Sequence, residues 1–150
     1  LLISHTLQKH VVDLGSGGGL PGIPLAIVNP NKQLYLVESN TKKSSFLLNT
    51  TSRLKLNNTT VINKRIEDIN QDELPEGYDI VCRAVGSASS IISFAKKHLK
   101  QDGVRLKLMK TAEQFNEEQM PLGYEVKEIE KYTSKAKDKT RILVTIEAER

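Results

Sequence analysis

The segment with the clearest chemical potential is a glycine cluster that follows directly on a short apolar run. Residues 11–14 read Val-Val-Asp-Leu, and glycine then occupies positions 15, 17, 18, 19 and 22. This pattern predicts a buried strand followed by a tight loop. Because glycine lacks a Cβ, a ligand can come against the main-chain N–H groups of such a loop, here those around Gly15 and Gly17. In a doubly wound sheet the ligand lies at the carboxyl ends of the strands, beside the first one.

A carboxylate completes this candidate site. Glu38 follows a second apolar run, residues 34–37, and so is expected at the end of the next strand. An acid about 20 residues beyond a glycine loop can accept hydrogen bonds from the hydroxyls of a ribose. The glycine loop and Glu38 together therefore predict a ligand of the adenosine type.

The glycines can be parsed in two ways. Gly17, Gly19 and Gly22 match the pattern G-x-G-x-x-G of dinucleotide-binding proteins, but this match begins after Gly15 has already ended the strand. Starting from Asp13, the pattern acid-x-G-x-G-x-G is typical of methyltransferases that use S-adenosylmethionine (SAM). The spacing alone leaves both ligands open.

The rest of the sequence predicts the elements that position these residues. Apolar runs predict strands at residues 11–14, 34–37, 60–62, 78–82 and 104–109. Helices are expected from Pro21, from an N-cap at Asn40 or Thr41, over the amphipathic segment 87–100, and over 113–119. Strands that alternate with helices predict parallel βαβ units with right-handed crossovers.

The last third of the chain favours the SAM-binding interpretation of the glycine loop. Residues 124–129 and 141–146 both alternate between apolar and polar, which predicts an antiparallel hairpin with no room for a crossover helix. A dinucleotide-binding fold continues with parallel strands, whereas the methyltransferase fold inserts an antiparallel last strand. We therefore predict an α/β, Rossmann-like class I SAM-dependent methyltransferase fold over a single domain, residues 1–150. Its sheet is mostly parallel and seven-stranded, with an antiparallel C-terminal hairpin.

Residues 12–26, and above all Leu-Pro-Gly-Ile-Pro at 20–24, resemble the signature of the glucose-inhibited division protein B family. This family is the bacterial ribosomal RNA small subunit methyltransferase G, which makes 7-methylguanosine in 16S rRNA. Residues 38–47, 65–68, 82–84 and 108–110 and Arg141 agree as well, so the resemblance covers roughly residues 10–147. Two departures are Lys110-Thr111, where many members have Lys-Gly, and the missing N-terminal helical segment of the family, so we expect an N-terminally truncated member.

The resemblance implies SAM as cofactor and 16S rRNA in the small ribosomal subunit as partner. Carried over by position, it implies SAM contacts at Gly15, Leu20, Ile66, Glu67 and Arg83, with Glu38 at the acidic ribose position. Methyl transfer to guanine N7 needs no general base, because N7 carries a lone pair and no proton. We therefore predict positioning residues and name no catalytic residue.

The cations supply candidate RNA contacts. The chain has 22 basic and 18 acidic residues, a net charge of +4 that leans toward a polyanionic partner. Arg83, at a predicted strand end, can bind the carboxylate of SAM, stack on a base or bind a phosphate. Further candidate RNA contacts, at the end of the fifth predicted strand and around the final hairpin, are Lys110, Lys135, Lys137, Lys139 and Arg141.

Other residue types limit the possible functions and sites. A single cysteine, Cys82, excludes an internal disulfide and a multi-cysteine zinc site, and His5, His10 and His98 lack metal-ligand spacing. No apolar run approaches the length of a membrane span. We expect a cytoplasmic monomer without a metal site or membrane segment. The alternatives are an NAD(P)-binding oxidoreductase domain and a non-catalytic RNA-binding fragment.

Overall fold

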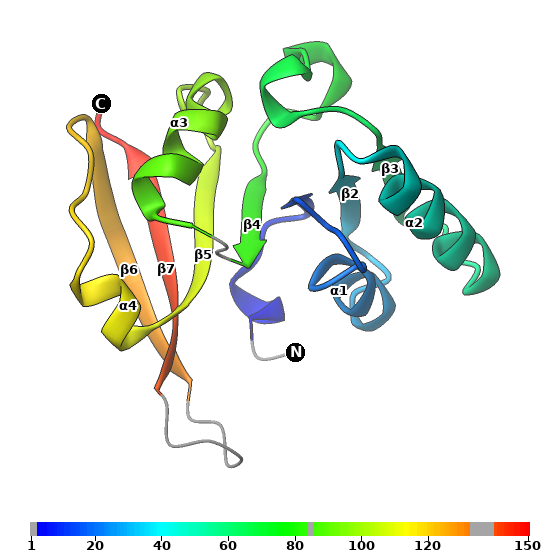
Figure 1. Ribbon diagram of the computed structural model, residues 1–150, viewed down its shortest axis with the longest axis horizontal. Coiled ribbons are helices and arrows are strands. Elements are labelled where there is room, and N and C mark those ends of the chain that lie inside the picture. The colour runs from blue at the N-terminus through cyan, green and yellow to red at the C-terminus, as the bar shows by residue number, and fades with distance from the viewer. Residues whose placement is uncertain (1–2, 84–85, 133–139) are drawn as a thin grey trace.

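The computed structural model describes residues 3–83, 86–132 and 140–150. Figure 1 shows a sheet with helices packed around it. Its strands are β1 (His10–Leu14), β2 (Gln33–Val37), β3 (Thr59–Ile62), β4 (Asp79–Arg83), β5 (Arg105–Thr111), β6 (Tyr124–Tyr132) and β7 (Arg141–Ala148). The helices are α1 (Gly22–Val28), α2 (Thr41–Arg53), α3 (Ala88–Leu99) and α4 (Ala112–Asn116), with short 3-10 turns η1 (Ser4–Thr6), η2 (Ile66–Asp68) and η3 (Gln71–Glu73).

The strand order confirms the predicted fold class. The strands form one seven-stranded sheet in the order β3-β2-β1-β4-β5-β7-β6. Neighbours from β3 to β5 pair in parallel, whereas β7 is antiparallel to both β5 and β6. The last strand is thus inserted beside β5, as expected for the methyltransferase version of a doubly wound sheet. The predicted hairpin is also confirmed, and both of its strands run farther than the alternating segments indicated.

Local sequence explains where the helices begin. The Asn40 side chain accepts a hydrogen bond from the Lys43 N–H at 3.0 Å, which caps α2 at the predicted position. Ser87 caps α3 in the same way, accepting from the Ser90 N–H at 3.1 Å. The helix expected over 113–119 is shorter, since α4 ends at Asn116. The polar link before β4 contains η2 and η3, which the sequence pattern did not predict.

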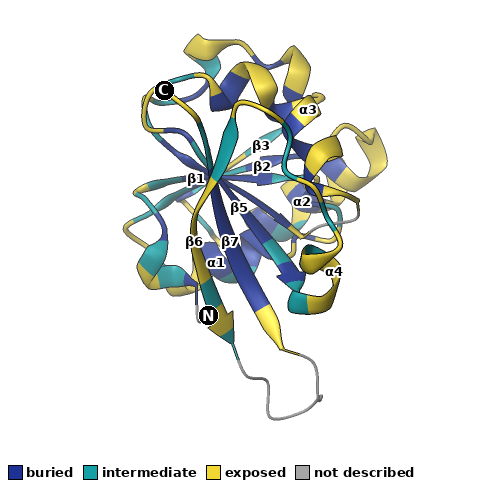
Figure 2. Cartoon of the chain, turned by 90° about the vertical axis from the view of Figure 1, so that its left-hand side faces the viewer, coloured by how far each residue is buried: buried dark blue, intermediate teal, exposed yellow. Residues whose placement is uncertain are grey.

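The core lies on both faces of the sheet. On one face, α3 packs through Ile91, Ile92 and Leu99 against alternate residues of β4 and β5. On the other, α1, Leu47 of α2 and the N-terminal residues Ile3 and Leu7 cover the opposite side chains. Figure 2 shows the central strands buried and the outer surfaces of the helices exposed. Because β1 to β4 are parallel, their carboxyl ends all lie at the same edge of the sheet.

Within the residues that the structure describes, no helix combines the length and apolar character needed to cross a bilayer.

Candidate functional site

A cavity of about 440 Å³ opens at the carboxyl ends of β1, β2 and β4. This volume is in the usual range of small-molecule sites, about 300–1,000 Å³. The cavity brings together five residues that were expected from separate segments of the sequence, namely Gly15, Glu38, Ile66, Glu67 and Arg83. Its remaining walls are Leu14, Val37, Ser39, Lys64, Arg65, Cys82, Ile91 and Phe94.

The glycine loop is tied to the end of β2. The N–H groups of Gly15 and Ser16 both donate to the Val37 carbonyl, at 2.9 and 3.1 Å. Gly15 and Gly17 have φ angles of +70° and +52°, in the left-handed region that favours glycine. The loop can therefore turn back over the strand ends because these positions lack a side chain.

Glu38 organises this loop as well as lining the cavity. Its carboxylate accepts from the Gly17 N–H at 3.1 Å through Oε1 and from the Asn40 N–H at 3.2 Å through Oε2. The residue is only 8% exposed. A carboxylate offers about four lone-pair positions, so Glu38 keeps capacity to accept further hydrogen bonds from the cavity side.

Two predicted loop residues lie beside the cavity rather than in its wall. Gly17 lies outside the lining, and the structure connects it to the site through the hydrogen bond to Glu38. Leu20 is 50% exposed and is also outside the lining. A contact between Leu20 and a ligand therefore stays a prediction.

Asp13 has a larger role than its place in the sequence pattern indicated. This carboxylate is 1% exposed, and its Oδ2 accepts from the N–H of Gly22, the first residue of α1, at 2.9 Å. Its Oδ1 is buried without a hydrogen-bond partner among the described residues. Burial raises the pKa of Asp13 to about 6. Asp13 thus holds the far end of the glycine loop. The only sequence signal for this role was its position as the acid of the acid-x-Gly pattern.

The opposite wall combines a cation and a thiol at the end of β4. Arg83 is exposed and lines the cavity, so its guanidinium is available to an anionic group. Cys82, expected in the core, is 8% exposed and also contributes to the lining. Burial raises the pKa of the Cys82 thiol to about 11, which keeps the sulfur protonated and unsuited to nucleophilic attack at neutral pH.

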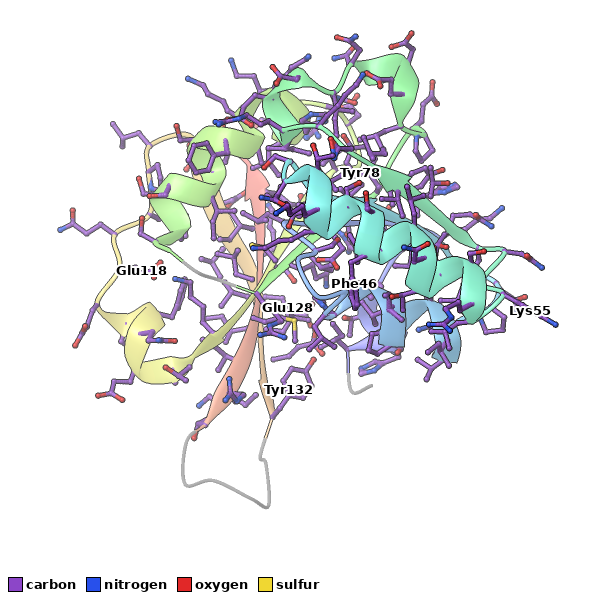
Figure 3. The ribbon with its side chains drawn as sticks, turned by 45° about the vertical axis from the view of Figure 1, so that its right-hand side comes forward. Phe46, Lys55, Tyr78, Glu118, Glu128 and Tyr132 are labelled. Carbon is purple, nitrogen blue, oxygen red and sulfur yellow. The ribbon has the colours of Figure 1, made fainter. Side chains whose placement is uncertain are left out.

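The expectation for Lys110 requires correction. This lysine is 5% exposed; its Nζ donates to the Gly86 carbonyl at 2.9 Å and forms an ion pair with Glu118. Figure 3 labels Glu118 between α4 and the start of α3. The second carboxylate oxygen of Glu118 accepts from the Ala88 N–H at 2.8 Å. Lys110 is therefore engaged inside the protein and is not a candidate phosphate contact.

The remaining candidate RNA contacts belong to the hairpin. Arg141 is exposed at the first position of β7, in register with Thr111 at the end of β5. Because Thr111 is the last residue of β5, Arg141 lies at the edge of the sheet where the cavity opens. Lys135, Lys137 and Lys139 lie outside the described residues.

No three His, Cys, Asp or Glu side chains gather as a metal site would require in the part of the chain that the structure describes.

A protein-family model described as "GidB: rRNA small subunit methyltransferase G" matches residues 1–144. Curated relatives carry the corresponding name, ribosomal RNA small subunit methyltransferase G. The relative from Hydrogenovibrio crunogenus is 33% identical over 142 residues, which are 93% of this chain and 64% of the relative. One from Coxiella burnetii is 40% identical over 113 residues, 74% of this chain and 53% of the relative. The chain thus spans between about half and two thirds of the length of these two proteins.

Solved structures with the same fold are far more distant in sequence. TrmK from M. capricolum, solved with S-adenosyl-homocysteine (SAH), matches with a TM-score of 0.70 at 14% identity, covering 99% of this chain and 67% of that protein. An rRNA methylase from Streptococcus thermophilus matches with a TM-score of 0.61 at 16% identity, covering 99% and 93%. At such identities the likeness establishes the shared fold.

Proposed function

Because this chain belongs to the family of rRNA small subunit methyltransferase G, we propose that its cavity binds SAM and that the protein methylates N7 of a guanine in 16S rRNA. The observation that carries the proposal is the cavity at the carboxyl edge of the sheet. It gathers a glycine loop, a carboxylate, an apolar wall and a guanidinium.

The lining fits each part of SAM. We expect Glu38 to accept hydrogen bonds from the ribose hydroxyls, as an acid at the end of the second strand does in nucleotide-binding folds. Ile66 and Ile91 offer apolar walls to the adenine ring, with Glu67 beside them. The guanidinium of Arg83 suits the methionyl carboxylate, since arginine matches the planar geometry of a carboxylate. When bound, SAM supplies a methyl group on a sulfonium centre.

The protein's contribution to the reaction is alignment and exclusion of water. Guanine N7 already presents a lone pair, so no side chain has to remove a proton. The protonated thiol of Cys82, and the carboxylate of Glu38 that accepts from two main-chain N–H groups, agree with a site that positions its ligands rather than performs acid–base chemistry. Holding the reacting atoms at near-attack distance is itself a large source of rate enhancement.

We assign the RNA to the carboxyl edge of the sheet. Arg83 and Arg141 are both exposed there, and the whole chain carries a net charge of +4. Cations on this edge can neutralise backbone phosphates while a guanine enters the cavity. Lys135, Lys137 and Lys139 stay candidates for the same role.

The test is methyl transfer from radiolabelled SAM to 16S rRNA and to small ribosomal subunits, followed by nuclease digestion and chromatography. We expect label in 7-methylguanosine. Arg83→Ala should reduce transfer strongly, whereas Arg53→Ala, at the exposed end of α2 on the opposite edge, should not. Label in another nucleoside, or retained transfer in Arg83→Ala, contradicts the proposal.

A further inference from the structure

A buried pair of polar rings lies behind the cavity wall. Tyr78, which directly precedes β4, and His98, in the last turn of α3, are both 0% exposed. The Tyr78 Oη lies 2.6 Å from His98 Nδ1, and His98 Nε2 lies 2.8 Å from the Ile66 carbonyl oxygen. Tyr78 is labelled in Figure 3. The sequence pattern assigned no role to His98, because its partners are distant along the chain.

The chemistry of the partners fixes the proton positions. A carbonyl oxygen can only accept, so His98 Nε2 must carry the proton of that hydrogen bond. In a neutral imidazole Nδ1 is then an acceptor, and the Tyr78 hydroxyl donates to it. Burial lowers the pKa of His98 and raises the pKa of Tyr78 to about 12, which keeps both groups neutral near pH 7. The result is a directed chain of hydrogen bonds from Tyr78 to Ile66.

This series of hydrogen bonds ends at Ile66, a residue of the cavity wall. Ile66 is 2% exposed and begins η2, and its carbonyl also accepts from the Ile69 N–H at 3.3 Å within that turn. The neighbouring Lys97 donates to the Ile69 carbonyl at 3.0 Å. Two consecutive side chains of α3 thus hold both ends of the turn that presents Ile66 and Glu67 to the cavity.

We propose that His98 is a positioning residue for the cofactor site: through Tyr78 on one side and the Ile66 carbonyl on the other, it fixes the turn that forms the adenine wall. The proposal rests on the proposed function, in that the ligand is an adenosine compound. His98 touches no ligand itself. Its effect is on the placement of the main chain of η2, and hence on the shape of the cavity.

The experiment compares His98→Met with His98→Gln. Methionine fills a similar volume without a donor, whereas the amide nitrogen of the glutamine can reach the Ile66 carbonyl much as Nε2 does. We expect SAH affinity, measured by calorimetry, to fall about tenfold in His98→Met, the effect of losing about one hydrogen bond. His98→Gln should recover most of it. A control, Ile146→Val at a buried position of β7, should lower thermal stability and leave SAH affinity unchanged.

A second readout needs no ligand. The Asp68 and Ile69 amides are hydrogen-bonded within the turn, to the carbonyls of Arg65 and Ile66. Their hydrogen exchange in the ligand-free protein should accelerate in His98→Met and not in Ile146→Val. Unchanged exchange in His98→Met, or equal SAH affinity in the methionine and glutamine variants, overturns the inference. Accelerated exchange in a protein whose wild type binds no SAH supports the role of His98 in the turn and overturns the proposed function instead.

Discussion

Replacing Asp13 by asparagine should change how the stability of this protein depends on pH. The carboxyl has an ordinary pKa of 3.8, and burial at the end of β1 raises it to about 6. The folded state therefore holds this proton more tightly than the unfolded state does. As a consequence, Asp13 lowers the free energy of unfolding as the pH rises from about 4 to about 6, and the loss persists at neutral pH.

The magnitude follows from the two pKa values. A difference of one pKa unit corresponds to about 1.4 kcal/mol, so the charged Asp13 costs about 3 kcal/mol at pH 7. Between pH 4 and pH 7 the expected change from this residue is about 2–3 kcal/mol, because a carboxyl is already partly ionised in the unfolded chain at pH 4. The asparagine of the variant can still accept from the Gly22 N–H, and the cost of its buried amide does not depend on pH.

The assay is urea unfolding of the wild type and Asp13→Asn across this pH range. The difference between their free energies of unfolding should move in favour of the variant by about 2–3 kcal/mol from pH 4 to pH 7. Using the difference removes the contributions of the titrating groups that do not interact with Asp13. Parallel curves would refute the reasoning, since they would mean that Asp13 ionises equally easily in both states.

Three further predictions concern one residue of the cavity wall and two contacts outside it. Glu38→Ala should weaken SAM binding by about 1–3 kcal/mol in calorimetry, the scale of a charge-assisted hydrogen bond, and unchanged affinity would remove Glu38 from the site. Glu118→Ala should lower the free energy of unfolding by about 3–5 kcal/mol, because it leaves the buried charge of Lys110 unpaired. Lys110→Met combined with Glu118→Leu should restore most of that loss, and a double variant as unstable as the single one would contradict the ion-pair explanation. Gly22→Ala should destabilise the fold by about 1–3 kcal/mol, since its Cβ would press on the Leu36 side chain, and a circular-dichroism melt like that of the wild type would argue against this packing.

The sequence predicted what depends on local pattern. The glycine loop, the strand before it and Glu38 lie within one βαβ unit, where spacing and topology place them at a common edge. The antiparallel insertion of β7 followed from two alternating segments with too short a link for a helix. Arg83 could be placed because a strand end can be read from an apolar run. These predictions needed no knowledge of which side chains meet.

What the sequence could not predict depends on contacts between elements. Lys110 was expected at the surface because a lysine at a strand end usually is, yet Glu118 on the segment after α4 binds it internally. His98 had no assigned role because Tyr78 and Ile66 are 20 and 32 residues away. Periodicity identifies the face on which such residues lie, whereas their pairing arises from how separate elements pack, β5 with the segment after α4 and α3 with η2.

The central claim, that the cavity is a SAM site, is tested most directly by calorimetric titration of the wild-type chain with SAM and, separately, with NAD. Both ligands contain adenosine, and the glycine pattern alone allowed either of them. We expect saturable binding of one SAM per chain and no binding of NAD at the same concentrations. Binding of NAD without binding of SAM would contradict the claim. It would indicate instead that Gly17, Gly19 and Gly22 form a dinucleotide-binding loop.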